Sequence, residues 1–232
     1  MIGNWKKKLF SYVDLFLAPS LFVKEKFMEA GFPEKKLVVL PNFVDFNPVD
    51  AVVEPEPYVV FIGRLSEEKG LITLLKAFNK LPDIPLKIVG EGPLESVLKD
   101  FVRSNHLLNI EFTGYMDGKR KRDILSKALM LIFPSECYES FGYSIIESYA
   151  YGVPVIASSA GAAKELVEEE LTGYIFESGN HDDLSRKISL MISDKKRLMG
   201  MRNTSWERAK HTYTKSTNYK NLYHLFTTLI NN

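Results

Sequence analysis

Short apolar runs and segments of helical spacing alternate along most of this chain, and this alternation constrains its fold more than any other feature. The apolar runs have the length and character of buried strands: residues 58–62, 86–89, 110–113, 129–133, 153–157 and 173–176. The helical segments are residues 71–81, 94–102, 122–128, the stretch around Glu147, 162–167 and 182–192. Strands that alternate with helices form a parallel sheet covered on both faces. We therefore expect an α/β fold, a doubly wound parallel sheet of Rossmann-like type, over residues 58–195.

The expected strands end in residues that favour loops. Gly63, Gly90, Gly114 and the pair Pro134–Ser135 each follow one of them. Because parallel strands place their carboxyl ends at one edge of the sheet, these loops should lie side by side. Open α/β sheets bind their ligands at that edge, so we expect the functional residues there.

Two segments precede the expected sheet. Residues 47–57 are rich in proline and acidic residues, which is typical of a linker between domains. Residues 1–46 have the pattern strand, helix, strand, over residues 14–18, 20–30 and 37–40. Ser20 is expected to cap the helix and Gly31 to end it. Such a βαβ unit is too small to bury its own core, so either the C-terminal helix or another chain should cover it.

Residues 196–232 are expected to form helices that pack back toward the N-terminal segment. Apolar side chains at helical spacing form one stripe in this region: Tyr219, Leu222, Tyr223, Phe226 and Ile230. Exposed apolar surface around the N-terminal unit would also favour association with another chain. That chain could be a second copy, in a homo-oligomer formed through residues 1–46 and the C-terminal helix.

Composition excludes several classes of protein. The chain has 30 basic and 29 acidic side chains, so no global field favours nucleic acid. The single cysteine, Cys137, excludes an intramolecular disulfide and is typical of a reducing compartment. No apolar window approaches the ~20 residues of a membrane span, and residues 1–14 lack the features of a signal peptide. We therefore expect a cytoplasmic protein.

Four basic residues follow one another at positions 119–122. The ordinary interpretation is the solvated start of a helix. The alternative is a contact with polyphosphate or with an anionic membrane surface, and the latter would make the protein peripheral to a membrane.

Glu139 and Glu147 stand on either side of Gly142, between two of the expected strands. Glu139 falls in a loop, and Glu147 falls in the following helix, roughly 7–8 Å along the axis from the helix start. Gly142 allows a sharp turn, and the first-turn amides of the helix form an anion site between the two acids. A ligand with hydroxyl groups at both ends and phosphate in the middle fits this layout. A nucleotide sugar has that form.

Arg64 and Lys69 follow the first strand of the sheet and would reach the same edge. Together they can neutralise a diphosphate through charge-assisted hydrogen bonds. The alternative is an ordinary solvated helix start. Gly90 and Gly92 stand on either side of Glu91 after the second strand, where they would allow close approach to a ligand or form a simple tight turn.

Other chemistries find little support in the sequence. The histidines are scattered without the spacing of metal ligands, and no D-x-D pair is present to hold a divalent ion on a diphosphate. Neither a G-x-S-x-G nucleophile motif nor a G-x-G-x-x-G dinucleotide motif occurs. We therefore expect no metal and no cofactor. Cys137 is interpreted as an inert thiol and Glu165 as a surface charge.

Taken in order, these features make the chain resemble the carboxyl-terminal half of the retaining glycosyltransferases of family 4, which have the two-domain GT-B fold. The matching motifs are G-R-L-S-E-E-K-G at 63–70, V-G-E-G-P at 89–93, F-T-G-Y at 112–115, F-P-S-x-x-Y-E-S-F-G-Y-S-I-I-E at 133–147, A-Y-G-V-P-V-I-A-S at 150–158 and L-T-G-Y-I-F at 171–176. Two further motifs are similar to the end of that family's amino-terminal domain: D-L-F-L-A-P-S at 14–20 and V-L-P-N-F-V-D at 39–45. The resemblance covers nearly the whole chain.

The resemblance implies a role for each matching residue. The catalytic set would be Glu139, Arg64 and Lys69, with Glu139 on the transferred sugar and the two cations on the diphosphate. Glu147 would contact the ribose hydroxyls. The other donor-binding residues would be Gly63, Gly90, Glu91, Gly92, Tyr115, Gly142, Tyr143 and Ser144. Such enzymes generally need no metal, so the cations and the helix N-terminus would stabilise the leaving group.

The chain departs from the family pattern in two places. Gly161–Ala162 stands where the family often has a glycine pair, at a loop that contacts the donor sugar. Only the last βαβ portion of the acceptor-binding domain is present, so we expect either a fragment or a short reading frame whose missing half is an acceptor-domain protein supplied in trans.

The expected function is therefore that of a glycosyltransferase half that takes a sugar from a UDP- or GDP-sugar, with retention, to an unknown acceptor. The alternative is a non-catalytic subunit that binds nucleotide sugar or assembles with a partner chain.

Overall fold

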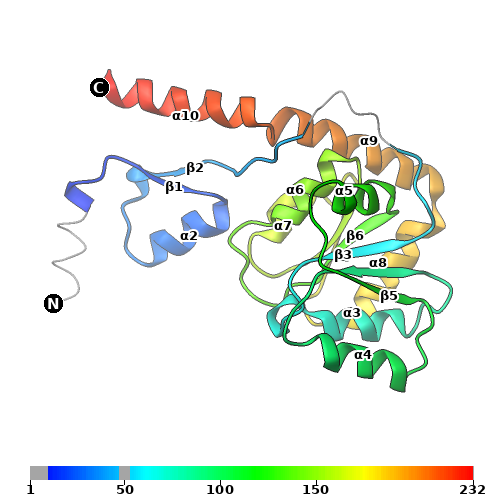
Figure 1. Cartoon of the computed structure of the whole chain (residues 1–232). Coiled ribbons are helices and arrows are strands. Elements are labelled where there is room, and N and C mark those ends of the chain that lie inside the picture. Colours follow the sequence, from blue (N-terminus) through cyan, green and yellow to red (C-terminus); the bar gives the residue numbers. More distant parts are fainter. Residues whose placement is uncertain (1–9, 47–52, 232) are drawn as a thin grey trace.

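The computed structural model describes residues 10–46 and 53–231, and most of it is built on a six-stranded parallel sheet (Figure 1). The strands are β3 (Val59–Ile62), β4 (Leu86–Val89), β5 (Ile110–Gly114), β6 (Met130–Phe133), β7 (Val155–Ser158) and β8 (Gly173–Phe176). Their order is β5-β4-β3-β6-β7-β8. The chain builds outward from β3 in one direction and from β6 in the other. This doubly wound topology confirms the predicted fold class, and such sheets bind ligands where the order reverses.

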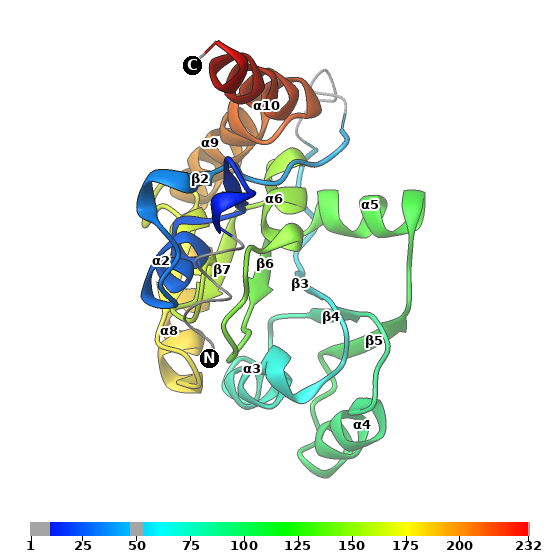
Figure 2. The same cartoon turned by 90° about the vertical axis from the view of Figure 1, so that its left-hand side faces the viewer.

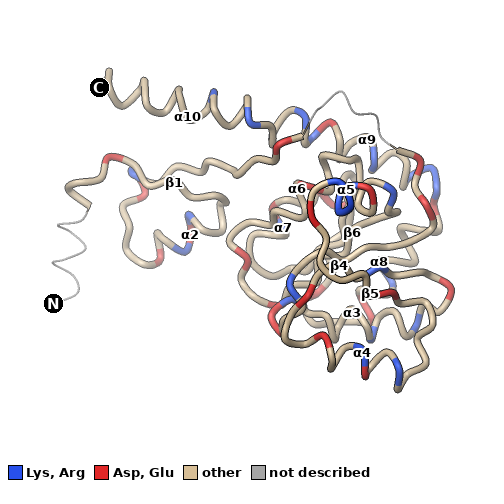
Figure 3. The backbone as a smooth tube through the Cα atoms, in the orientation of Figure 1, with Lys and Arg blue, Asp and Glu red and all other residues tan. Residues whose placement is uncertain are grey.

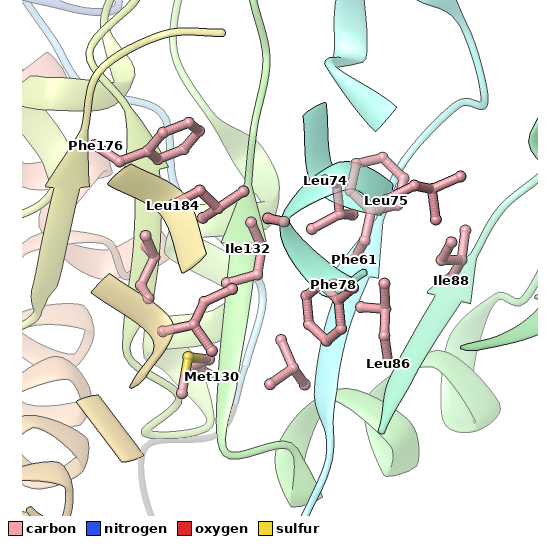
Figure 4. Close-up of a cluster of buried hydrophobic side chains, with 14 of the residues drawn as sticks. Phe61, Leu74, Leu75, Phe78, Leu86, Ile88, Met130, Ile132, Phe176 and Leu184 are labelled. Carbon is pink, nitrogen blue, oxygen red and sulfur yellow. The ribbon is translucent and has the colours of Figure 1, made fainter. Parts of the chain in front are cut away.

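Helices cover both faces of the sheet. One face packs against α3 (Leu71–Phe78), α4 (Glu95–Ser104) and α8 (His181–Ser193), and the other against α5 (Gly118–Lys127), α6 (Tyr143–Ala150) and α7 (Ala163–Leu166). Successive residues of β3 alternate between the two cores, with Val59 and Phe61 in the first and Val60 in the second. Figure 4 shows part of the first core, where Phe61 lies near Leu74 and Phe78 of α3. Because both faces are buried, the strands have the continuous apolar sequences noted above.

The helix α9 (Lys195–Thr212) takes part in both cores. Leu198 packs in the first core and Ala209 in the second. Between them, the fully buried Arg202 donates hydrogen bonds to three backbone carbonyl oxygens: Ala128 at 2.7 Å, Ser126 at 3.0 Å and Val53 at 3.0 Å. Burial lowers the pKa of Arg202 to about 10, so the guanidinium is charged at neutral pH.

Two helices of the sheet domain, α3 and α5, differ from their expected bounds by three or more residues at one end. α5 begins at Gly118 rather than at Arg122, so the basic run lies within its first turns instead of before it. α3 ends at Phe78 rather than at Leu81. The Leu81 amide bonds to the Phe78 carbonyl in a tighter turn, just before a proline that cannot continue the helix.

A separate βαβ unit precedes the sheet. Its elements are β1 (Phe16–Ala18), α2 (Leu21–Glu29), the 3-10 turn η1 (Glu34–Lys36) and β2 (Leu37–Val39). The two strands pair in parallel. Ser20 caps α2 as expected, because its Oγ accepts the Val23 amide at 3.1 Å. Gly31 follows the helix with a φ of +88°. No residue of α2 is fully buried, so this helix does not close a core.

The C-terminal helix α10 (Lys215–Ile230) extends past this unit (Figures 1 and 2). The Asn218 amide group donates to the Pro41 carbonyl at 2.7 Å. Leu222 and Phe226 line a groove of about 320 Å³ together with Leu17 of β1. α10 therefore contacts the N-terminal segment through this hydrogen bond and this groove.

The rest of the predicted apolar stripe faces solvent. Tyr219 is 66%, Tyr223 60% and Ile230 81% exposed. Residues 1–9 of the predicted N-terminal remnant and residues 47–52 of the predicted linker lie outside the described residues. The domain limits therefore stay predictions. Within the described chain, no helix combines the length and the apolar character that a bilayer crossing requires.

Candidate functional site

Two adjoining pockets lie at the carboxyl ends of β3, β4 and β6. The inner pocket, of about 430 Å³, is lined by Asn42, residues 61–64, Lys69, Phe133, Ser135, residues 139–144 and Glu147. The outer pocket, of about 380 Å³, is lined by residues 62–64, 89–91, 115–118 and Lys121. The two pockets share residues 62–64, so Arg64 stands between them. Figure 3 shows charged residues of both signs in the loops at this edge.

The structure brings most of the predicted site residues into these pockets. The inner pocket contains Gly63, Arg64, Lys69, Glu139, Gly142, Tyr143, Ser144 and Glu147. The outer pocket contains Gly63, Arg64, Gly90, Glu91 and Tyr115. Gly92 lines neither pocket. The two cations and the two acids that the sequence singled out thus share one cavity, and their roles there stay predictions.

Lys69 and Glu139 form an ion pair in the inner pocket. Their side chains are 26% and 19% exposed, so the pair is screened less than a surface pair. The Ser135 hydroxyl also donates to Glu139 Oε1, at 2.8 Å. Ser135 is itself held from β7, because the Ser158 hydroxyl donates to its carbonyl. The Glu139 carboxylate is therefore oriented from two sides.

Lys121 and Glu147 form a second ion pair, with Nζ and Oε1 2.7 Å apart. Lys121 lies in the first turns of α5 and also lines the outer pocket, so it connects the two pockets. Sequence reasoning missed this residue, because the basic run was placed before the helix and interpreted as solvated. The neighbouring Lys119, Arg120 and Arg122 are exposed, and the membrane contact proposed for the run stays a prediction.

The start of α6 faces the inner pocket. Gly142 makes the turn with a φ of +150°, and a Cβ there would lie 3.0 Å from the Ile145 side chain. The first-turn amides of a helix have no acceptor within it. Tyr143 and Ser144, which carry two of these amides, line the inner pocket. The positive end of the helix dipole therefore faces the inner pocket, which Glu139 and Glu147 also line.

The outer pocket has apolar walls and an acid at its rim. Ile62, Val89 and Met116 supply apolar surface. Glu91 Oε1 accepts the Tyr115 amide at 3.2 Å, which holds the loops after β4 and β5 together. A flat, partly apolar group fits between such walls.

The structure gives a reason for glycine at positions 90 and 92 that the sequence did not reveal. A Cβ on Gly90 would lie 1.9 Å from the Gly63 carbonyl oxygen, and a Cβ on Gly92 would lie 2.4 Å from the Leu65 carbonyl oxygen. These glycines therefore admit the neighbouring loop of the chain itself. The close packing also explains why Gly92 faces Leu65 and not the outer pocket.

Cys137 and Glu165 were given ordinary interpretations from the sequence. Burial raises the pKa of the Cys137 thiol, and the Glu139 carboxylate raises it further, which agrees with an inert thiol. Glu165 is more than a surface charge, because it accepts the backbone amides of Leu21, at 2.8 Å, and Phe22. In residues 10–46 and 53–231, no three His, Cys, Asp or Glu side chains come together as a metal site.

Comparison with known proteins identifies similar sequences and folds. Residues 45–211 match the family model described as "Glycosyl transferases group 1". The chain is 29% identical to the sulfoquinovosyl transferase SQD2 of Arabidopsis thaliana over 146 residues, which covers 61% of this chain and 28% of that protein. It is 30% identical to the GDP-mannose-dependent alpha-mannosyltransferase of Corynebacterium glutamicum over 152 residues, or 66% of this chain and 35% of that protein.

A solved structure shows the same fold. The Anabaena protein HepE, in complex with UDP and glucose, superposes with a TM-score of 0.81 at 22% identity, covering 92% of this chain and 63% of that one. The chain therefore spans less than two thirds of the length of each of these proteins.

Proposed function

The chain belongs to the glycosyl transferase group 1 family, and from this premise we propose that it binds a nucleotide diphosphate sugar across the inner and outer pockets and takes part in glycosyl transfer. The observation that carries the proposal is the set of charged groups that line the inner pocket. Glu139 and Glu147 are its acids, and Arg64, Lys69 and the start of α6 are its positive groups.

The positive groups would bind the diphosphate. Arg64 carries a guanidinium that can contact two phosphate oxygens at once, and Lys69 supplies a point charge. The amides of Tyr143 and Ser144 add hydrogen bonds at a helix N-terminus, where anions are favoured. These groups provide the charge compensation that a diphosphate needs, and they support the expectation that no divalent ion is required.

The remaining site residues would bind the two ends of the donor. Glu139 would accept hydrogen bonds from the transferred sugar, and Glu147 from the ribose hydroxyls. The base would occupy the outer pocket beside Tyr115, Gly90 and Glu91. Gly92 keeps the loops together and would contribute only indirectly. UDP and GDP are the nucleotides named for the relatives described above, so we propose one of these two.

In the transfer step, the acceptor nucleophile forms a bond to the anomeric carbon and gives up its proton to the departing diphosphate or to solvent. The bond between the anomeric carbon and the diphosphate oxygen breaks, and the leaving oxygen gains negative charge. Arg64, Lys69 and the start of α6 would stabilise that charge, because they are already in place before the reaction. We propose that the chain follows family 4 and that the sugar is transferred with retention of configuration. Analysis of the anomeric product by NMR tests this step.

We also propose that the β1–α2–β2 unit and α10 dock against an acceptor-binding domain. The α2 helix has no fully buried residue, and the relatives are longer than this chain. A homo-oligomer through the same surfaces is the alternative. Light scattering of the purified chain tests it, since a monomer at every concentration would argue against the homo-oligomer.

Isothermal titration is the experiment that tests donor binding. We expect heat from UDP and UDP-glucose, or from GDP and GDP-mannose, and competition by inorganic diphosphate. A folded sample that binds none of these compounds would overturn the proposal. ADP serves as the control for base preference.

A second candidate function is a non-catalytic subunit that binds the donor and needs a partner chain. The lack of a closed core around α2 is the observation that favours it. Hydrolysis or transfer of the donor by the chain alone would argue for an enzyme. Donor binding without turnover would favour the subunit.

A further inference from the structure

Two side chains join the β1–α2–β2 unit to the main domain: Ser20 bonds to the loop that carries Glu139, and Glu165 of α7 bonds to the start of α2. Ser20, the cap of α2, donates its hydroxyl hydrogen to the Ser140 carbonyl at 2.8 Å. Glu165, on α7, accepts the first two amides of α2, that of Leu21 at 2.8 Å. The partners in these contacts are 120 to 144 positions apart in the chain. We call this pair of contacts the α2 clamp.

The clamp supplies hydrogen-bond acceptors at the start of α2. A helix leaves its first four amides without partners inside the helix. Here Glu165 accepts two of them, those of Leu21 and Phe22, and the Ser20 hydroxyl accepts a third, that of Val23, at 3.1 Å. The first turn of α2 has no acidic residue of its own. The negative charge that the helix dipole favours therefore comes from α7.

The same region of the chain holds the backbone of Glu139. The Ala162 amide, just before α7, donates to the Glu139 carbonyl at 3.0 Å. Gly161 packs so closely that a Cβ there would lie 2.6 Å from the Glu139 amide nitrogen. The Glu139 loop is therefore held between the start of α2 on one side and the residues before α7 on the other. Figure 1 shows α2 on the side of the main domain on which α7 lies.

We propose that Glu165 and Ser20 are positioning residues that fix the Glu139 loop against the β1–α2–β2 unit and so direct the Glu139 carboxylate toward the transferred sugar. This inference rests on the proposed function, which places the sugar at Glu139. Neither clamp residue lines the inner or the outer pocket, so both act through the loop. Lys69 and Ser135 hold the carboxylate itself, and the clamp holds the backbone beneath it.

Hydrogen exchange tests the clamp without any ligand. Glu165→Gln leaves one acceptor oxygen for two amides, and Ser20→Ala removes the cap and the contact with Ser140. Each variant should speed amide exchange both in residues 21–24 and in residues 137–142. Faster exchange in α2 alone, with the Glu139 loop unchanged, would overturn the inference. Glu25→Gln, which removes a charge from an exposed position of α2, is the matched control.

Donor titration tests the consequence at the site. The measured quantity is the ratio of the dissociation constant of the nucleotide to that of its nucleotide sugar, which we call the sugar gain. The ligand pair is UDP and UDP-glucose or GDP and GDP-mannose, whichever the parent binds more tightly. Glu165→Gln should lower this ratio by about fivefold while the affinity for the nucleotide alone changes by less than about twofold. Ser20→Ala should do the same, and Ser20→Thr, which keeps the hydroxyl, should restore the parental ratio. An unchanged ratio in the first two variants would overturn the inference.

Failure of the proposed function and failure of the positioning role give different results. If the parent binds neither nucleotide, the proposed function fails, and the exchange experiment still decides whether the clamp orders the Glu139 loop. If the parent shows a sugar gain and the clamp variants keep it, only the positioning role fails. Should Glu165→Gln not fold, Glu165→Asp and Ser20→Ala carry both measurements.

Discussion

The ammonium group of Lys69 is paired with the carboxylate of Glu139 inside the inner pocket. The two residues proposed to serve different parts of the donor thus neutralise each other when no donor is bound. A diphosphate that binds Lys69 must compete with Glu139, and its own charge would repel a carboxylate left without a partner. The two side chains should therefore be coupled in binding, which a pair of single substitutions and their combination can measure.

Lys69→Met should weaken binding of the free nucleotide diphosphate more than Arg64→Met does. Loss of one charge-assisted contact costs about 1.5–3 kcal/mol. Lys69→Met also leaves Glu139 unpaired beside the phosphate, whereas Arg64→Met leaves that carboxylate paired. Adding Glu139→Gln to Lys69→Met should recover part of the loss. Titration of the parent, Lys69→Met, Glu139→Gln and the double variant with UDP and GDP gives the four values of the cycle, and additive effects would contradict the coupling.

Glu147→Gln should remove the preference of the site for a ribonucleotide over its 2′-deoxy form. If Glu147 accepts from the ribose hydroxyls, the parent should prefer UDP or GDP over the 2′-deoxy compound by about 1.5–3 kcal/mol, the range for a hydrogen bond to a charged group. In Glu147→Gln the two compounds should bind nearly alike. Lys121→Met is the companion variant. This substitution frees Glu147 from an ion pair whose two side chains are 29% and 30% exposed. It should change the binding free energy of the nucleotide by less than about 1 kcal/mol. An unchanged ribose preference in Glu147→Gln would contradict the assignment.

The fold was predictable because most strands of the sheet are buried on both faces and so appear as apolar runs, whereas the edge strand β5 is partly exposed. β3, β4, β6, β7 and β8 are found within one or two residues of where the sequence placed them. The turn at Gly142 and the cap at Ser20 were also predictable, since local backbone geometry and hydrogen bonding decide both.

The parts that escaped prediction depend on contacts between distant segments. Glu165 finds its partners 143 and 144 positions away, and no periodic pattern marks such a contact. Lys121 meets Glu147 only because α5 begins earlier than its apolar residues suggest. Gly90 and Gly92 were correctly seen as sites of close approach, but the approaching group is the backbone of a neighbouring loop.

Cys137 should react with iodoacetamide faster in Glu139→Gln and slower in Lys69→Met. Burial and the Glu139 carboxylate raise the pKa of the thiol, while the Lys69 ammonium lowers it. Removing the carboxylate therefore lowers the pKa and increases the thiolate fraction at a given pH, and removing the ammonium does the opposite. Mass spectrometry gives the rates near neutral pH. All three proteins should react alike in denaturant, and equal rates in the folded proteins would contradict the charge effects.

Gly90→Ala should destabilise the fold far more than Gly179→Ala. Both glycines have a positive φ, of +139° and +77°. A Cβ on Gly90 would lie 1.9 Å from the Gly63 carbonyl oxygen, whereas nothing lies within 4 Å of one on Gly179. Overpacking and strain should cost Gly90→Ala about 3 kcal/mol or more, and strain alone should cost Gly179→Ala about 1 kcal/mol. Urea unfolding measures both, and similar losses would contradict the packing argument.

Arg202→Met should lower the free energy of unfolding by about 3 kcal/mol or more, because several buried carbonyl oxygens each lose a charged donor. The side chain is fully buried, and its partners lie in the segment before β3 and around the end of α5. Arg197→Met, on an exposed part of the same helix, should cost less than about 1 kcal/mol. The pKa of Arg202 is lowered from 12.5 to about 10, so the guanidinium is protonated in both the folded and the unfolded protein at pH 9 and below. The difference in stability between parent and Arg202→Met should therefore be constant between about pH 6 and 9. Above that range the unfolded state binds more protons than the folded state, so the parent should gain stability relative to the variant as the pH rises. Urea titrations at several pH values measure it, and a variant as stable as the parent would show that these carbonyl groups gain nothing from the buried charge.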